Sequence, residues 1–412
     1  MPRIRYFDEF VKRLRDCGEF RKHLTKETYF TRSSAKLTLP HLMTFLLTNN
    51  RKSAQIALNE FFRRLPQGKE TMTKQSYFEA REKLSYTAFV QMNTDLVNMV
   101  ENGAEGDEMR MYRGFRPIAV DGTALDIPPT AKKDFGYQIT SGEAFPKARA
   151  LAFVDVLNDF ILRAQMDLYA KGERAITVEI LDGYDAKPSD LFLFDRGFYS
   201  KDLAEKVTNT GASFVFRVKT RCQKAIDAAE HIDQEIFVGG LKLRVINIVL
   251  KNGEVEKLVT NIFEKSFTPD FFAKVYNMRW GVETTYSRLK ERLEIENFSS
   301  GKKNLILQDF YASVVICNFT SLACFDTQEL LDAEVKNKGL KHQRKPNMSL
   351  AFSEMRELLI ASISGIVPLN QGLDELMAAI KKNPTPVRPG RSYPRKVKHL
   401  SAKFYLSKKR CI

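Results

Sequence analysis

Cysteine, histidine and tryptophan are scarce in this chain of 412 residues, which has five cysteines, five histidines and one tryptophan. No two cysteines have the CxxC spacing of a zinc site, and the odd, scattered set does not describe a disulfide framework. Glycine-rich loops of the GxGxxG or Walker type are also missing. The sequence therefore argues against a cysteine-based zinc site and against a bound nucleotide cofactor.

Long apolar runs are missing as well. The N-terminus has no apolar segment of the kind found in a secretory signal. The most apolar stretch, residues 305–325, contains Gln308, Asp309 and Asn318, so we expect a buried helix rather than a membrane span. The sequence predicts an intracellular, cytoplasmic protein without a membrane partner.

Acidic residues are outnumbered by basic ones, 50 against 65, which gives a formal net charge of +15. A surplus of this size is typical of proteins that bind a polyanion, most often nucleic acid. Residues 381–412 hold 11 Lys or Arg, four Pro and no acid, which predicts an extended basic tail. The tail is either a DNA-binding arm or a non-specific, solubilising segment.

The first hundred residues have the spacing of amphipathic helices. Within them, residues 52–84 resemble a helix pair of which the second, led by residues 73–77, could enter a DNA groove. A plain helical bundle explains the same pattern. Residues 103–114 have the composition of a linker.

From Pro117 the pattern changes to that of strands. Residues 150–156 and 160–169, separated by Asn158-Asp159, predict a hairpin, and helices at 177–181 and 201–207 alternate with further strands. Residues 219–268 alternate around Gly239-Gly240 and Asn252-Gly253, which predicts a β-rich insertion. The fold class is therefore α/β, a mixed sheet with flanking helices and an N-terminal helical domain.

Two apolar runs each end in an aspartate, in the segments V-D-G-T at Asp121 and D-R-G-F-Y at Asp195. Two such strands side by side would hold two carboxylates at one sheet rim, with Glu283 closing the set from a packed helix. Three hard oxygen ligands suit Mg²⁺ or Mn²⁺, and a two-metal site suits phosphodiester chemistry. Each Asp-Gly alone also fits an ordinary turn, and Asp126 is the reserve for Asp121.

Glu283 belongs to a run that should be helical, since Thr268-Pro269-Asp270 has the pattern of an N-cap, a Pro at the first position and an acid in the first turn. On a continuous α-helix, Tyr276, Arg279, Glu283 and Lys290 share a stripe about 60° wide. Cations, a phenol and a carboxylate on one stripe suit a metal-assisted site on a phosphate backbone. A solvated, salt-bridged helix face explains the stripe equally well.

The spacing Y-(2)-R-(3)-E-(6)-K, preceded by V-D-G-T and D-R-G-F-Y, resembles the DDE transposases of the insertion-sequence-four family over roughly residues 110–325. The resemblance implies an RNase H-like catalytic core that cuts DNA at the ends of a mobile element and joins them to a new site. It implies a metal-binding triad of Asp121, Asp195 and Glu283. Tyr276, Arg279 and Lys290 would then contact DNA phosphates and position the ends.

Other DNA contacts are less specified. Arg196 either contacts DNA or pairs with a carboxylate. Better-known members of the family stack a flipped base on a Trp of the insertion, whereas Trp280 here lies beside Arg279. Stacking must therefore use Trp280 or another aromatic such as Phe237 or Phe263.

The resulting organisation has four parts: a helical DNA-binding domain at 1–110, an RNase H-like core at 111–218 and 269–365, a β-rich insertion at 219–268 and a basic tail at 366–412. The predicted function is a metal-dependent DNA transposase, with the nucleoid as its place in the cytoplasm. A homodimer on DNA is expected, since two ends must be brought together. An RNase H-like nuclease without strand transfer and a catalytically silent DNA-binding protein are the alternatives.

Overall fold

The computed structural model describes most of the chain, namely residues 5–32, 35–48, 51–66, 71–103, 109–140, 142–250, 252–366 and 368–388. The chain divides into two compact units, each assembled from segments that are distant in sequence. Unit 1 comprises Met1–Gly106, Asp126–Pro146 and Ser287–Ile412, and unit 2 comprises Asp107–Leu125 and Lys147–Tyr286.

Unit 2 is built on a mixed sheet in the order β4-β3-β1-β5-β6-β9-β8-β7. Its strands are β1 (Arg116–Asp126), β3 (Glu143–Asp155), β4 (Phe160–Leu168), β5 (Asp190–Phe194), β6 (Ser213–Arg217), β7 (Asp233–Val238), β8 (Leu241–Val249) and β9 (Val255–Thr260). β5 runs parallel to both β1 and β6, whereas the β3–β4, β6–β9, β9–β8 and β8–β7 pairs are antiparallel. The predicted α/β class with a mixed sheet is confirmed.

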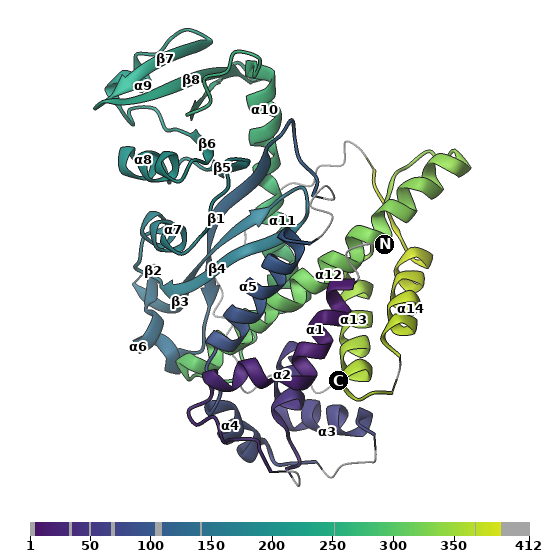
Figure 1. The fold of residues 1–412 in the computed structure, drawn as a ribbon. Coiled ribbons are helices and arrows are strands. Elements are labelled where there is room, and N and C mark those ends of the chain that lie inside the picture. Colours follow the sequence, from purple (N-terminus) through teal and green to yellow (C-terminus); the bar gives the residue numbers. More distant parts are fainter. Residues whose placement is uncertain are drawn as a thin grey trace. The chain divides into compact units, whose positions relative to one another are not determined.

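Helices flank this sheet on both faces (Figure 1). They are α7 (Glu173–Asp182), α8 (Lys201–Asn209), α9 (Lys224–Asp227), α10 (Pro269–Asn277) and α11 (Gly281–Ser287). One apolar cluster joins Phe271, Phe272 and Val275 of α10 to Leu191 and Leu193 of β5. Since side chains alternate across a strand, Phe192 and Phe194 of β5 point to the opposite face. Burial of both faces explains why β5 is a continuous apolar run.

The predicted hairpin is present as β3 and β4, with Asp159 in a left-handed conformation (φ 55°) at its turn. The prediction of a β-rich insertion implied that residues 219–268 are separate from the core. In the structure this segment is part of the core sheet. Its strand β9 pairs with β6, so β7, β8 and β9 extend the same sheet. An unpaired edge at β6 would leave backbone N–H and C=O groups unsatisfied, and β9 satisfies them.

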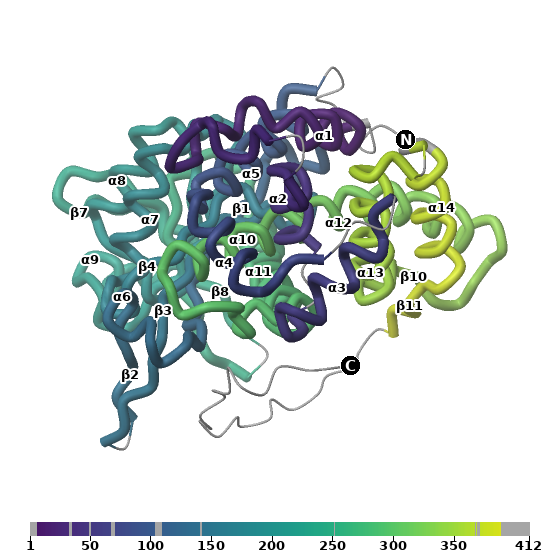
Figure 2. Tube along the Cα trace, turned by 90° about the horizontal axis from the view of Figure 1, so that it is seen from below, coloured from purple at the N-terminus to yellow at the C-terminus, as the bar shows by residue number. Residues whose placement is uncertain are grey.

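Unit 1 is helical and is organised around α12 (Lys303–Lys338). Its other helices are α1 (Arg5–Asp16), α2 (Leu39–Leu47), α3 (Ala54–Arg64), α4 (Lys74–Glu82), α5 (Thr87–Glu101), α6 (Lys132–Phe135), α13 (Met348–Ile363) and α14 (Leu369–Lys382). Short strands β2 (Tyr137–Thr140), which pairs with the start of β3, and β10 (Arg344–Lys345) with β11 (Thr385–Pro386) complete it. Figure 2 shows α13 beside α14.

α12 is long and apolar enough to cross a membrane, yet its most apolar window is entirely buried inside the structure. The buried helix predicted for residues 305–325 is therefore confirmed. It serves as the core helix against which α2, α5, α13 and α14 pack.

The units differ from the predicted division of the chain. Residues 269–365 were expected to belong to one core, but the boundary falls between Tyr286 and Ser287, because the segment after it packs with the N-terminal helices. The predicted tail 366–412 begins with a helix, α14, and residues 389–412 lie outside the described residues. Part of the predicted linker, residues 104–108, also lies outside them.

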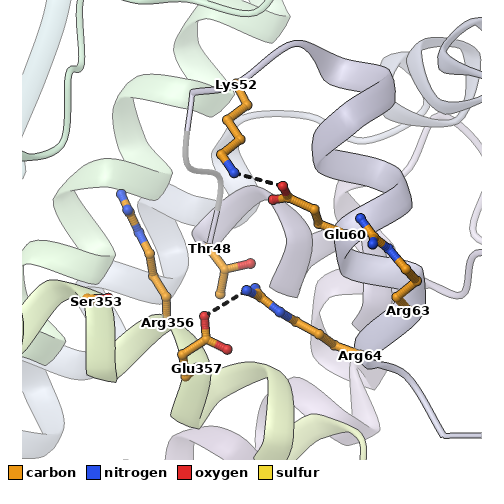
Figure 3. Close-up of a pocket in the computed structure, with 8 residues that line it drawn as sticks. All are labelled: Thr48, Lys52, Glu60, Arg63, Arg64, Ser353, Arg356 and Glu357. Atoms are coloured by element: carbon orange, nitrogen blue, oxygen red, sulfur yellow. Dashed lines mark hydrogen bonds and ion pairs between the residues drawn. The ribbon is translucent and has the colours of Figure 1, made fainter. Parts of the chain in front are cut away.

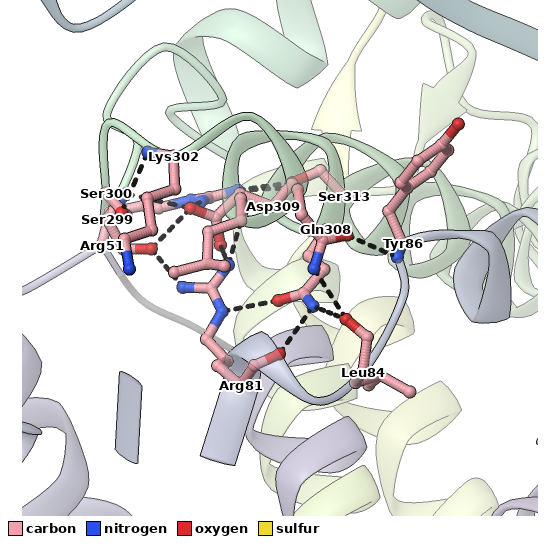
Figure 4. Close-up of polar contacts among 12 residues, drawn as sticks. Arg51, Arg81, Leu84, Tyr86, Ser299, Ser300, Lys302, Gln308, Asp309 and Ser313 are labelled. Carbon is pink, nitrogen blue, oxygen red and sulfur yellow. Dashed lines mark hydrogen bonds and ion pairs between the residues drawn. The ribbon is translucent and has the colours of Figure 1, made fainter. Parts of the chain in front are cut away.

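A buried polar network ties α4 to α12 (Figure 4). Arg81, which is fully buried, donates to Asp309 Oδ1 at 2.9 Å and to Gln308 Oε1 at 2.7 Å. Ser299 donates to Asp309 Oδ2 from its backbone N–H at 2.9 Å and its hydroxyl at 2.6 Å. Arg51 lies 3.5 Å from the same Oδ2. Every oxygen of the Asp309 carboxylate is thus satisfied, as a buried charge requires.

Candidate active site

The two predicted aspartates lie side by side on neighbouring strands of unit 2. β1 and β5 are parallel, and their register pairs Ala119 with Leu193 and Val120 with Phe194. Asp121 follows Val120 and Asp195 follows Phe194, so the two aspartates continue neighbouring strands that are about 4.8 Å apart. Both have the parity of Leu193, so both point to the face covered by α10. Asp121 and Asp195 therefore lie next to one another on neighbouring strands and point to the same face of the sheet.

The helix α10 and the 3-10 turn after it (Met278–Trp280) bring two of the predicted DNA-contacting residues to these carboxylates. The helix starts as expected, with Thr268 at the N-cap and Pro269 at the first helical position. The Tyr276 hydroxyl donates a hydrogen bond to Asp195 Oδ1 at 3.3 Å. Arg279 Nη1 lies 3.5 Å from Asp121 Oδ2. Each aspartate therefore has its own partner from the same helical segment.

This segment is not the continuous α-helix that the stripe assumed. A 3-10 turn (Met278–Trp280) separates α10 from α11, and a π-helical segment (Arg288–Arg292) follows α11. Each change of helix type alters the angle per residue, so the four side chains do not keep one common phase. Tyr276 and Arg279 are 5% and 3% exposed, whereas Glu283 is exposed. The alternative of a solvated salt-bridged face is therefore wrong for the first two.

Glu283 lies on α11, one turn before Tyr286. The Tyr286 hydroxyl donates to the main-chain oxygen of Asp121 at 2.7 Å, which anchors α11 to β1 at the first aspartate. Among the described residues, no group of three His, Cys, Asp or Glu side chains is close enough to hold a metal ion. The structure therefore places Asp121 and Asp195 on neighbouring strands, and Glu283 does not form a group of three metal ligands with them among the described residues.

Lys290 belongs to unit 1, where its Nζ lies 3.8 Å from Glu296 Oε1. Arg196 lies in the turn directly after Asp195, and its side chain is exposed. Trp280 is 42% exposed, and the Arg279 guanidinium lies 4.8 Å from the centre of its ring. Of the two alternative stacking residues, Phe237 is 66% exposed near the end of β7, and Phe263 is half-buried.

Glu173, at the start of α7, is a neighbour of the site that the sequence did not reveal. A Cβ on Gly122 would lie 2.4 Å from its Oε1, so a larger residue at this position would require the Glu173 side chain to move. The expected turn at Asp121-Gly122 is wrong: β1 continues to Asp126, and Gly122 admits Glu173 from the α7 face of the sheet. Arg149 of β3 holds the Glu173 carboxylate at 2.9 Å. Its only sequence signal is an acid in a helical first turn.

The site is electrostatically unfavourable for a carboxylate. Burial raises the pKa of Asp121 from 3.8 to about 6, against the opposing effects of the Gly122 N–H and of Arg279, and the charges of Glu173 and Asp195 add to the increase. Arg279 Nε is buried without a hydrogen-bond partner among the described residues. A bound cation would stabilise the charged form of Asp121, and a bound anion such as phosphate would give Arg279 Nε an acceptor.

The residues present fit a hard divalent cation in part. Asp121 and Asp195 offer the carboxylate oxygens that Mg²⁺ or Mn²⁺ prefers, and they are close enough to interact electrostatically. Two protein carboxylates are a sufficient protein contribution when water and substrate phosphate complete the shell.

Fold and site together define a class. The order β4-β3-β1-β5-β6, with adjacent aspartates on its central strands and helices on both faces, is that of an RNase H-like core. The family model of the transposase DDE domain matches residues 113–319. The chain belongs to this family of DDE transposases.

A solved structure shares the fold. The cryo-EM structure of the piggyBac transposase synaptic complex with hairpin DNA is similar to this chain, with a TM-score of 0.50 and 13% sequence identity. The match covers 93% of this chain and 86% of the piggyBac chain. A comparison with curated proteins gives no match.

Proposed function

We propose that this protein is a transposase of the insertion-sequence-four type that cuts DNA at the ends of a mobile element and joins them to target DNA. The observation that carries the proposal is the adjacency of Asp121 and Asp195 on β1 and β5, facing the Tyr276–Arg279 segment. The transposase family and the similar fold, seen elsewhere in a synaptic complex with hairpin DNA, support it.

In this proposal Asp121, Asp195 and Glu283 hold Mg²⁺ or Mn²⁺, with Glu283 completing the set on substrate binding. The ions, when bound, supply positive charge to the attacking and leaving oxygens of the phosphodiester. Arg279 transfers its guanidinium from Asp121 to a DNA phosphate, where its Nε, which has no partner among the residues that the structure describes, gains an acceptor. Tyr276 fixes the orientation of Asp195 through their hydrogen bond. Water and then a 3′-hydroxyl are the nucleophiles.

The remaining contacts are assigned by charge and exposure. Trp280 offers an exposed ring for stacking on a base, and Arg196 offers an exposed cation beside Asp195. Lys290 would hold a phosphate near the scissile bond. The helices of residues 1–110 and the basic residues after 380 would bind duplex DNA.

In the N-terminal part, Thr73 caps α4 as the helix-pair prediction requires, but Tyr77 and Arg81 of α4 are buried. Besides the first turn of α4, the exposed residues of this helix are the acidic Glu79 and Glu82, so we assign the groove contact to the first turn. We further propose a dimer that pairs two element ends, acting on the nucleoid in the cytoplasm.

A strand-transfer assay separates this function from the alternatives. The full chain is incubated with the DNA flanking its coding sequence, a supercoiled target plasmid and Mg²⁺. A transposase yields ends joined to the target. Cleaved ends without joined product would establish a nuclease, and bound but intact DNA would establish a silent DNA-binding protein.

A further inference from the structure

Unit 1 contains a basic pocket of about 470 Å³ that is remote in sequence from the DDE motif. Helices α3 and α13 and the end of α2 form it, and Figure 3 shows its side chains. Its lining residues are Thr48, Lys52, Glu60, Arg63, Arg64, Ser353, Arg356 and Glu357. Four of these are basic and two are acidic, so the pocket keeps a positive charge.

Both acids are already bonded to a cation. Lys52 Nζ lies 2.7 Å from Glu60 Oε1, and Arg64 Nη2 lies 3.1 Å from Glu357 Oε1. The positive charge that remains belongs to Arg63 and Arg356. Arg63 is exposed and donates its Nε to the Asn59 carbonyl at 3.2 Å, which leaves its Nη atoms for other acceptors.

Arg356 is the residue that an ordinary surface does not explain. Its Nε is buried without a hydrogen-bond partner among the described residues, and in Figure 3 its side chain extends away from Glu357. Burial, with the nearby charge of Arg51, lowers its pKa to about 10, so it carries an unfavourably placed charge. Arg63 and Arg64 could simply stabilise the C-terminus of α3. That reason does not apply to Arg356, in the middle of α13.

We propose that this pocket binds a phosphate of the DNA backbone. Its volume suits a phosphate with its sugar, and an oxyanion would accept from Arg63 and, once the Arg356 side chain shifts toward the pocket, from its Nε. None of the eight lining residues is aromatic, so the pocket provides no platform for a base and reads no sequence. That the anion is DNA rests on the proposed function. The pocket adds a docking surface from α3 and α13, outside the α4 groove-binding segment.

The test measures the salt dependence of DNA binding by the full chain. Fluorescence anisotropy gives the affinity for a duplex from the element end at several salt concentrations. We expect Arg63→Gln with Arg356→Gln to reduce the slope of log affinity against log salt by about 1 to 2, and the affinity by about 10-fold or more. Arg356→Lys, which keeps the charge, should retain most of the slope.

The matched control is Lys12→Gln with Lys338→Gln, which removes two exposed cations of the same unit outside the pocket. It should leave the slope nearly unchanged. Because Arg356 is partly buried, melting curves verify folding, and Arg63→Gln alone supplies a variant at an exposed site. An unchanged slope in folded Arg63→Gln and in the double variant would overturn the proposal.

Two further readouts separate the sources of failure. Cleavage activity is measured on the same proteins: normal cleavage with an unchanged slope refutes the pocket and keeps the transposase. If the wild-type protein does not cleave DNA but the double variant has a reduced salt slope, the transposase function is refuted and the phosphate-binding pocket stands. Calorimetric titration with inorganic phosphate tests a free-anion site. Phosphate binding that is lost in the double variant while the DNA slope is unchanged would overturn the DNA assignment.

Discussion

Two aspartates, one in each unit, differ in how completely the protein compensates their charges. Asp309 is 1% exposed, and both of its oxygens accept hydrogen bonds from Arg81 and Ser299. Asp121 is 22% exposed and lies beside two other carboxylates. Arg279 Nη1 is 3.5 Å away, and Arg279 Nε has no hydrogen-bond partner within the part of the chain that the structure describes. The first arrangement is complete within the protein. The second becomes complete only with a cation and a phosphate, which is typical of a functional site.

The pKa values of the two groups move apart accordingly. Burial alone would raise the pKa of Asp309, but Arg81 and Arg51 reverse that effect and lower it. Burial raises the pKa of Asp121 to about 6. Asp309 therefore contributes stability above the pKa it has in the unfolded chain, lost as the pH falls through its folded pKa. Asp121 removes stability from the metal-free protein as the pH rises from about 4 to 6.

Breaking the buried network around Asp309 should have the largest effect on stability. Asp309→Ala leaves Arg81 and Arg51 buried without their counter-charge, so we expect the free energy of unfolding to fall by about 3–5 kcal/mol. Urea unfolding measures it. Asp332→Ala, at an exposed position of the same helix, is the control and should change stability by less than about 0.5 kcal/mol. A loss below 1 kcal/mol in Asp309→Ala would show that the network is dispensable.

Removing the Arg279 cation beside Asp121 should reduce activity rather than stability. Arg279→Gln should reduce strand cleavage about 10²-fold, because the scissile phosphate loses its positioning. Arg174→Gln, at an exposed position on α7, provides the comparison and should cleave normally. Cleavage by Arg279→Gln at the wild-type rate would remove this residue from the site.

Neutralising the first aspartate should stabilise the metal-free protein. With EDTA present at pH 7.5, we expect Asp121→Asn to raise the free energy of unfolding by about 1–3 kcal/mol, since a pKa raised from 3.8 to about 6 corresponds to at most about 3 kcal/mol. The gain should vanish near pH 4, where the folded wild type holds the proton. A loss of stability at pH 7.5 would place Asp121 in the same class as Asp309.

The smallest effect concerns the contact behind Asp121. Gly122→Ala places a methyl group against Glu173 and should cost about 1–2 kcal/mol. The double variant with Glu173→Ala should recover most of that loss, which a double-mutant cycle measures. Gly183→Ala is the matched control, because nothing lies within 4 Å of its Cβ position. Additive losses in the cycle would contradict the proposed contact.

The two arrangements also differ in how far the sequence predicts them. The adjacency of Asp121 and Asp195 follows from two apolar strands that each lead to an aspartate, and the start of α10 at Pro269 follows from local chemistry. Arg81 and Asp309 are 228 positions apart, and neither has a local pattern that names its partner. The packing of Glu173 on Gly122 is equally a tertiary contact, so Asp121-Gly122 resembled a turn although β1 continues through it.

The stripe failed for a related reason. One common phase requires a single regular helix, but a 3-10 turn lies between α10 and α11. Tyr276 and Arg279 therefore reach the aspartates as buried residues, while Glu283 stays exposed.

The most direct test of the central claim compares equivalent Asp→Asn changes on one strand-cleavage assay with Mg²⁺. Asp195→Asn, in the proposed centre, should abolish cleavage while DNA binding stays near the wild-type level. Asp185→Asn, at an exposed position in the loop before β5, should cleave as the wild type does. Full cleavage by folded Asp195→Asn would contradict the assignment of the β1–β5 rim as the catalytic centre.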